Sequence, residues 1–301
     1  MCNEKFWARI LFLFALVIHV SIAFDLYPLY NDIVYGDDSC ATTNISLRYW
    51  TMRVPKTTLA LEYKADNRLS ADFAQIYFPA KEKPLSLSNA YSSSTSMDPW
   101  HRPSRYAPFI HFVFAKTFCN LPYGPASLLH IVLQSVLFIA SLAFAFKVLN
   151  IWSLFLPSIV LVDVCLFLSP VGHSWIERGQ FSLYVGLSYL WLTMAFITQK
   201  HRYAIISAFF SYVKWTSFPY IFVAYAVYIL SSKSNKELKN RIISLTLFAG
   251  VILLLLLSFP KDTFEFINGL RLQELSFEPG GLSLGRIVPL PVVKVLPFCS
   301  Y

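Results

Sequence analysis

The sequence Ser70-Ala71-Asp72-Phe73-Ala74-Gln75-Ile76-Tyr77-Phe78-Pro79 lies in a long polar segment between apolar stretches of the chain. Asp72 is the residue of chemical interest, because a carboxylate beside an aromatic ring just outside a bilayer can serve as a general base. Asp is also a common N-cap, so the same residue can simply begin a short helix. The rest of the chain has to decide between these two interpretations.

The composition is that of a membrane protein. Of the 301 residues, 56% are hydrophobic and 14% are charged, whereas soluble domains carry about 25% charged residues. The formal net charge of +8 is explained by Lys and Arg in cytoplasmic loops, which membrane proteins favour. We therefore expect an all-α, polytopic helical bundle in contact with membrane lipids, and no nucleic-acid partner.

The five cysteines do not indicate a metal site or a disulfide scaffold. No two of them form a Cys-x-x-Cys pair, and only Cys40 stands clearly in a polar outside loop, with Cys299 as its one candidate partner. The adjacent Asp37 and Asp38 fit a turn better than a cation site. We assign no metal and no other cofactor.

Hydropathy and the placement of Lys and Arg divide the chain into four parts. Residues 1–24 hold a first transmembrane helix, the apolar run 6–24, which we expect to be retained because no small-residue cleavage site ends it. Residues 25–106 form a large extracytoplasmic loop with the catalytic segment. Residues 107–259 form a transmembrane bundle with short or re-entrant helices, and residues 260–301 form an extracytoplasmic tail.

Two basic turns constrain the path through the bundle. Residues 199–202 and 231–241 are strongly basic, so both should face the cytoplasm. Both can do so only if residues 203–230 run out and back as a re-entrant or paired-helix hairpin; the alternative is one long tilted crossing, with a basic loop on the wrong side. The other expected segments are an interfacial helix at 106–122 and crossings at 125–147, 152–170, 179–198 and 242–259.

Two charges fall inside apolar segments, where charges are costly and often functional. Lys214 lies near the expected break in the hairpin, where it can bind an anionic lipid head group or extend to the interface. Asp163 lies mid-helix and is either functional or a structural carboxylate paired with a polar neighbour. Irregular backbone at membrane depth is tolerated where it lines a cavity or is buried, so the break near Lys214 is a candidate site wall.

Further candidate binding residues gather on the outer face. Arg178 and Gln180 stand at the outer mouth of a helix, where the guanidinium can hold a phosphate and the amide can bond a sugar hydroxyl. The alternative is an interfacial anchor beside Trp175. Arg105 and Tyr106 belong to a second basic and aromatic cluster, which can equally be a solvated loop.

Motifs for soluble nucleotide-dependent chemistry are missing from the sequence. There is no Walker-type loop and no dinucleotide glycine fingerprint, and neither a His-Glu-x-x-His nor a Gly-x-Ser-x-Gly motif is present. An enzyme of this kind would not recognise its activated substrate through a soluble nucleotide-binding fold. A lipid-borne substrate that enters sideways from the bilayer would fit.

The order of several short motifs resembles glycosyltransferase family 87, the polyprenol-phosphate-mannose-dependent mannosyltransferases of the GT-C fold. Residues 72–77 are similar to the family's Asp-Phe-x-x-Tyr stretch with one extra residue, and residues 105–109 are similar to its Tyr-Pro-Pro-like segment without the first Pro. Residues 178–183 contain a Gly-Gln that opens a helix, with Ser where the family usually has Asn. Lys214 and Pro219 are similar to the family's Lys and Pro but lie farther apart in the sequence. Residues 279–286 are similar to the family's Gly-Asn-Gln-Ser-Leu-Arg-Gly segment.

This resemblance implies an inverting transfer of a sugar, mannose in that family, from a polyprenyl-phosphate donor to a hydroxyl of a lipid or glycan acceptor on the extracytoplasmic face. It requires no nucleotide. A base would accept the acceptor proton and fixed cations would stabilise the departing phosphate. The residues that would carry the reaction are catalytic Asp72 and substrate-binding Tyr77, Arg105, Tyr106, Arg178, Gln180 and Lys214.

The chain departs from the family in two places. Residues 25–65 look like an insertion, and the family usually continues with further spanning helices after the segment around Arg286, so the resemblance implies a C-terminally truncated chain. A catalytically degenerate homologue and a small-solute transporter with Asp163 and Lys214 as coupling charges are the alternatives. We expect a multi-pass membrane protein, and either a bacterial cytoplasmic membrane or the endoplasmic reticulum fits.

Overall fold

The computed structural model describes residues 9–13, 17, 71–82, 90–91, 103–167, 175 and 179–275. This part of the chain is mostly helical and contains no strand, which confirms the all-α class for the described residues. Most of the expected first helix, most of the expected outside loop before residue 103 and the tail after residue 275 lie outside the described residues.

The described helices, with η for a 3-10 helix, are in chain order α4 (Ala71–Glu82), α5 (Pro108–Thr117), α6 (Tyr123–Val148), η2 (Trp152–Leu154), α7 (Phe155–Phe167), α9 (Ser182–Thr198), α10 (His201–Val213), η3 (Trp215–Ser217), α11 (Phe218–Leu230), α12 (Asn235–Leu257) and α13 (Pro260–Leu275).

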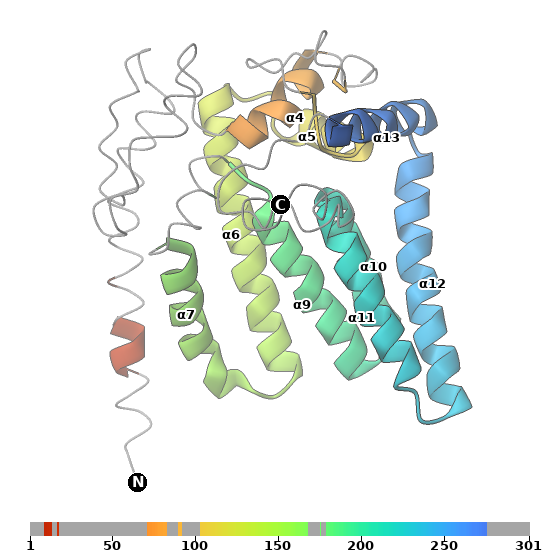
Figure 1. Ribbon diagram of the computed structural model, residues 1–301. Helices are drawn as coiled ribbons and strands as arrows, with labels where there is room; N and C mark the ends of the chain where they lie inside the picture. Colours follow the sequence, from red (N-terminus) through yellow and green to blue (C-terminus); the bar gives the residue numbers. More distant parts are fainter. Residues whose placement is uncertain are drawn as a thin grey trace.

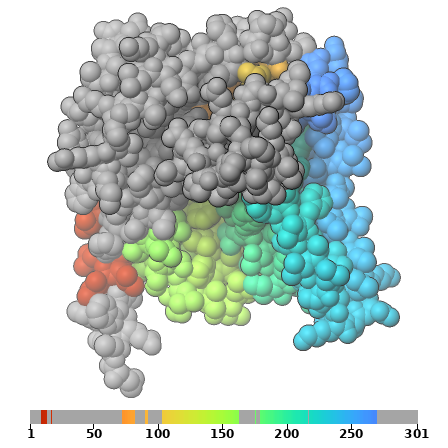
Figure 2. Space-filling model, in the orientation of Figure 1, coloured from red at the N-terminus to blue at the C-terminus, as the bar shows by residue number. Residues whose placement is uncertain are grey.

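Two of these helices, α6 and α12, are long and apolar enough to cross a membrane. They contain 26 and 23 residues, or about 39 and 35 Å at 1.5 Å per residue, which exceeds the roughly 30 Å of a hydrocarbon core. Both run between the same two ends of the molecule (Figure 1), and α12 forms one outer edge of it (Figure 2). Large apolar side chains such as Leu253, Leu254 and Leu257 are exposed along α12, as a lipid-facing helix requires.

Helices α10 and α11 form a hairpin rather than one crossing. Near the end of α10, the Tyr212 hydroxyl donates to the carbonyl of Leu255, close to the end of α12, at 3.4 Å. Near the end of α11, Tyr228 lies under the guanidinium of Arg241, close to the start of α12, at 4.1 Å. Helices α10 and α11 therefore run along α12 in opposite directions, which is the paired-helix arrangement expected for residues 203–230; its placement in a membrane stays a prediction.

The break between the two helices follows from local sequence. Lys214 leaves the helical region with φ −130° and ψ 81°, and a single 3-10 turn follows. Pro219 occupies the first turn of α11, where its missing N–H costs nothing, whereas a continuous helix would lose a hydrogen bond and clash there.

The basic turns meet at one end of the bundle. Ala145, near the end of α6, packs with Met194 and Tyr203 at the turn between α9 and α10. The Tyr228 hydroxyl donates to the Phe196 carbonyl at 3.1 Å, which brings the turn between α11 and α12 to the same place. The basic residues near this end are Lys147, Lys200, Arg202, Lys233, Lys236, Lys239 and Arg241.

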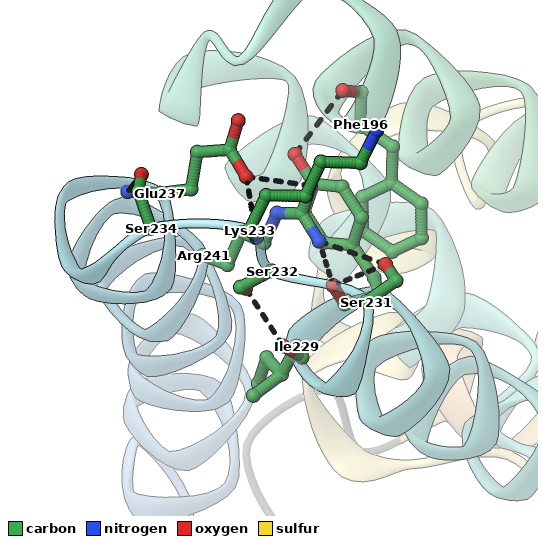
Figure 3. A network of polar contacts seen from close by, with 9 residues as sticks. Phe196, Ile229, Ser231, Ser232, Lys233, Ser234, Glu237 and Arg241 are labelled. Atoms are coloured by element: carbon green, nitrogen blue, oxygen red, sulfur yellow. Dashed lines mark hydrogen bonds and ion pairs between the residues drawn. The ribbon is translucent and has the colours of Figure 1, made fainter.

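A polar network closes the turn between α11 and α12 (Figure 3). The Arg241 guanidinium donates to the Tyr228 carbonyl and to the Ser231 hydroxyl, the latter at 2.8 Å, and pairs with Glu237 at 3.6 Å. Ser234 caps α12 by accepting from the Glu237 amide at 3.2 Å. The helix consequently begins at residue 235, seven residues before the crossing expected at 242–259, because Lys and Arg are good helix formers once a cap is present.

Helices α4, α5 and α13 lie across the opposite end of the bundle (Figure 1). The ten residues of α5 extend about 15 Å, half of the roughly 30 Å of a hydrocarbon core, and the interfacial position expected within residues 106–122 stays a prediction. The expected tail begins with a described helix, α13, which packs against α5 and α12.

An aromatic core attaches α4 to the bundle. Phe73 is fully buried, and its ring lies between the rings of Phe114, Phe118, Tyr123 and His130, at centroid distances of 5.8, 6.1, 5.9 and 5.1 Å. Aromatic pairs in this range contribute packing energy beyond their buried area. The cluster therefore fixes the position of α4, and with it that of the neighbouring Asp72.

Candidate functional site

Four segments converge at the end of the bundle opposite the basic turns. They are the start of α4, residues 104–106, the break at residues 214–217 and the turn at residues 179–181. These segments carry most of the candidate site residues that the sequence predicts. Their contacts with one another define the candidate site.

Side chains from other segments hold the backbone of residues 104–106. The amide N–H of Arg105 donates to Gln75 Oε1 of α4 at 3.4 Å, and the Arg105 carbonyl accepts from Trp215 Nε1 of η3 at 2.9 Å. The Tyr106 carbonyl accepts from the Tyr91 hydroxyl at 3.1 Å. The Arg105 side chain is nevertheless exposed, so a fixed peptide presents an accessible guanidinium.

Ser104 and His111 support this segment from beneath. The Ser104 hydroxyl lies 3.0 Å from His111 Nε2 and accepts from the Tyr106 amide at 3.3 Å. Burial lowers the pKa of His111 to about 4, although the backbone of Ile76 and Tyr106 opposes the shift. His111 is therefore neutral at physiological pH and acts as a hydrogen-bonding group, not as a charge.

Lys214 and Tyr106 come together across the site. The Lys214 ammonium lies 5.1 Å from the centre of the Tyr106 ring, within the range of a cation–π interaction. The Tyr106 ring also contacts Phe181, at 4.5 Å between centroids. Tyr106 is buried, with 3% of its surface exposed, so the ring positions Lys214 and leaves little surface for stacking on a sugar.

The turn at residues 179–181 brings Gln180 to the same end. Gly179 has φ 60°, a conformation that glycine adopts without a side-chain penalty. The Gln180 carbonyl accepts from Gln134 Nε2 of α6 at 3.0 Å, and Ser182 donates to Gln180 Oε1 at 3.1 Å. Phe181 then contacts Tyr106, which ties the turn to the site.

Asp72 lies in the first turn of α4 and is partly exposed. It precedes Gln75 by three residues, so both side chains share one face of the helix. Gln75 bonds the Arg105 amide, and three residues of helix separate Asp72 from Gln75 by about 4.5 Å along the axis, so Asp72 lies on the face of α4 that contacts Arg105. An acidic side chain in the first turn of a helix also interacts favourably with the helix dipole.

Tyr77 lies elsewhere. Its hydroxyl donates to the Leu121 carbonyl at 2.6 Å and accepts from Lys81 at 3.3 Å. Only 1% of the residue is exposed, and its ring packs on Phe73 at 5.7 Å. In this structure Tyr77 joins α4 to the loop before α6 and offers no free ring face to a ligand.

Two predicted positions cannot be placed. Arg178 lies outside the described residues, and the side chain of Asp163 does so too, although its backbone belongs to α7. The site as described therefore brings together Asp72, Arg105, Tyr106, Gln180 and Lys214.

Helix α13 adds two carboxylates that the sequence did not single out. Asp262 is 9% exposed, and Glu265 Oε2 is buried without a hydrogen-bond partner. Burial and the nearby Tyr212, Asp262 and Glu265 raise the pKa of Tyr91 well above its ordinary value. Tyr91 is therefore a hydrogen-bond donor at all physiological pH values, as its bond to Tyr106 requires.

Over the described ranges, no group of three or more His, Cys, Asp or Glu side chains is placed to hold a metal ion.

No sequence signal marks Gln75, Ser104, His111, Tyr91 or Trp215. These residues matter because they bond to residues 104–106, and residue type alone does not reveal such contacts.

No protein-family description, curated protein or solved structure gives a significant match to this chain.

Proposed function

We propose that the chain is a multi-pass membrane glycosyltransferase of GT-C type, which moves a sugar from a polyprenyl-phosphate carrier to an acceptor hydroxyl on the extracytoplasmic face. The donor sugar is mannose by the resemblance to glycosyltransferase family 87. The observation that supports this proposal is the convergence of one carboxylate, Asp72, with two cations, Arg105 and Lys214, at the end of the bundle opposite the basic turns.

The arrangement of charge fits the topology of such an enzyme. Lys and Arg concentrate at the cytoplasmic ends of membrane helices, so the end with residues 199–202 and 231–241 would face the cytoplasm. The candidate site would then face the opposite compartment. A polyprenyl-phosphate head group lies at the membrane surface and would reach Arg105 and Lys214 there without leaving the bilayer.

Asp72 would act as the general base. As the acceptor oxygen bonds to C1 of the sugar, its proton passes to the Asp72 carboxylate. The bond between C1 and the phosphate oxygen breaks with inversion, and polyprenyl phosphate leaves with the electron pair. Arg105 and Lys214 would stabilise the negative charge that develops on this phosphate.

The first experiment measures transfer of radiolabelled mannose from polyprenyl-phosphate mannose in membranes that contain wild-type protein or Asp72→Asn. The substitution keeps the size and hydrogen-bonding shape of the side chain but removes the base, so we expect a loss of about 10²–10⁴-fold in rate. Lys214→Gln should also reduce transfer strongly. Lys116→Gln is the matched control, since Lys116 is an exposed lysine on α5.

Equal transfer by wild type and Asp72→Asn would remove the assignment of Asp72. No transfer by the wild-type protein from any polyprenyl-phosphate hexose would contradict the transferase proposal itself. That result would favour the transport alternative, with Lys214 at the tip of the hairpin as its coupling charge.

A further inference from the structure

The peptide of Arg105 is held from both sides by side chains that are distant in sequence. Gln75 accepts from its N–H at 3.4 Å, and Trp215 donates to its carbonyl at 2.9 Å. Gln75 belongs to α4, which carries Asp72, and Trp215 directly follows Lys214 at the hairpin break. One bond therefore connects Arg105 to the helix that carries Asp72, and the other connects it to the hairpin break that carries Lys214.

We infer that Gln75 and Trp215 are positioning residues: they hold the Arg105 backbone between α4, which carries Asp72, and the hairpin break, which carries Lys214, and so restrict where the Arg105 guanidinium can reach. The inference rests on the proposed function, because the group to be positioned is the cation for a departing lipid phosphate. Neither Gln75 nor Trp215 touches the reacting atoms in this scheme. Both act through the Arg105 peptide.

Two observations and one general argument support this role. Gln75 is buried, with 6% of its surface exposed, although Gln usually faces solvent. The Arg105 side chain is exposed while its peptide is bonded on both sides. An arginine side chain loses much rotamer freedom when it binds, so fixing its backbone in advance lowers the cost of organising the site around a phosphate.

Trp215 is also anchored in its own right. Its ring meets Phe266 of α13 edge-on at 6.4 Å, so Trp215→Phe would keep an aromatic ring there and remove only the N–H donor. Trp191 is the matched control, because its indole N–H is buried without a hydrogen-bond partner. Trp191→Phe removes a donor that bonds nothing and should leave the site unchanged.

The first test uses trypsin and does not depend on activity. Trypsin cleaves the bond between Arg105 and Tyr106 only when this stretch of backbone leaves its hydrogen-bond partners, among them Gln75 and Trp215. Loss of one hydrogen bond of about 1 kcal/mol should raise local opening about fivefold. We expect faster cleavage after Arg105 in Trp215→Phe and Gln75→Leu, no change in Trp191→Phe, and constant cleavage after Lys116 as the internal reference for global unfolding.

The second test measures transfer kinetics with polyprenyl-phosphate mannose. A positioning role predicts that kcat falls at least fivefold in both variants, with a smaller change in KM, because the cation acts on charge that develops in the transition state. A purely structural role would lower the amount of folded protein and leave kcat per folded molecule unchanged.

The outcomes separate this inference from the proposed function. Equal cleavage after Arg105 in wild type, Trp215→Phe and Gln75→Leu overturns the inference, whatever the activity. Faster cleavage with unchanged kcat overturns the positioning role. A wild-type protein that transfers no sugar contradicts the proposed function, and the trypsin result still decides whether Gln75 and Trp215 hold the Arg105 peptide.

Discussion

Burial determines what each residue at the site can do. Arg105 and Asp72 reach solvent, whereas Tyr106 and Tyr77 are almost fully covered by protein. His111 is completely buried and neutral. The accessible groups are therefore charged and suited to a polar ligand, and the buried aromatic and imidazole rings form the support beneath them.

The neutral His111 predicts a specific dependence of stability on pH. The unfolded chain takes up a proton at this residue as the pH falls through 6.5, whereas the folded protein does so only near pH 4. The contribution of His111 to stability is therefore complete above pH 6.5 and is lost as the pH falls toward 4, by about 2 kcal/mol at pH 5.

The comparison for this prediction is His111→Gln, which keeps a hydrogen-bonding group for Ser104 and does not titrate. Thermal unfolding in detergent at pH 7.5 and pH 5 should show a larger drop in Tm for wild type than for the variant. Parallel drops in the two proteins would mean that His111 is not the group responsible.

The sequence was enough to predict the charged candidate site residues. It was not enough to predict the residues that hydrogen-bond to the site backbone and hold it in place. Lys214 attracts notice because it interrupts an apolar segment, and Asp72 and Arg105 because they belong to recognisable short motifs. Trp215 bonds a residue 110 positions away, and Gln75 bonds one 30 positions away. Hydropathy and local spacing carry no information about contacts over such separations, so only the folded chain identifies them.

At the scale of the helices, the placement of Lys and Arg predicted the direction in which the chain runs better than it predicted where each helix begins and ends. The requirement that two basic turns share one side gave the hairpin at residues 203–230, and the contacts of Tyr212 and Tyr228 with α12 show this paired-helix arrangement. Helix α12 begins before the crossing expected at 242–259, because the Ser234 cap allows the basic residues to join the helix. Helix α13 has no long apolar run, so hydropathy did not predict it.

The contacts of Arg241 predict a stabilising role for the turn between α11 and α12. Arg241→Met would remove the bonds to the Tyr228 carbonyl and the Ser231 hydroxyl and the contact with the Tyr228 ring. We expect a loss of about 1–3 kcal/mol, seen as a lower thermal unfolding temperature, because the carbonyl and the Glu237 carboxylate lose a charged partner.

Lys239→Met is the control for this loss. Lys239 is an exposed lysine on the same helix, two residues before Arg241, so its substitution should change stability by no more than about 0.5 kcal/mol. If Arg241→Met behaved like Lys239→Met, the network in Figure 3 would not hold the hairpin to α12.

At the scale of the whole molecule, the two ends differ in chemical character. One end collects Lys and Arg at the turns of the bundle, and the other carries the transverse helices α4, α5 and α13 with the candidate site (Figure 1). A bundle with this asymmetry should insert with the basic end in the cytoplasm. The proposed function depends on this orientation, because it places the site on the extracytoplasmic side.

Single cysteines introduced into a variant without its five native cysteines test the orientation. Asn235→Cys and Asn268→Cys form a matched pair of exposed asparagines, at the basic end on α12 and at the opposite end on α13. A membrane-impermeant maleimide should label Asn268→Cys in intact cells or sealed vesicles of native orientation. It should label Asn235→Cys only after permeabilisation, because the Lys-rich start of α12 would then be cytoplasmic.

Lys200→Cys, in the turn between α9 and α10, completes the test. The hairpin of α10 and α11 places residues 200 and 235 on the same side, so their labelling should be identical. Labelling of these two positions from opposite sides would require a single long crossing in place of the hairpin. Labelling of all three positions from the same side would mean that α12 does not span the bilayer. The candidate site would then face the same compartment as the basic turns.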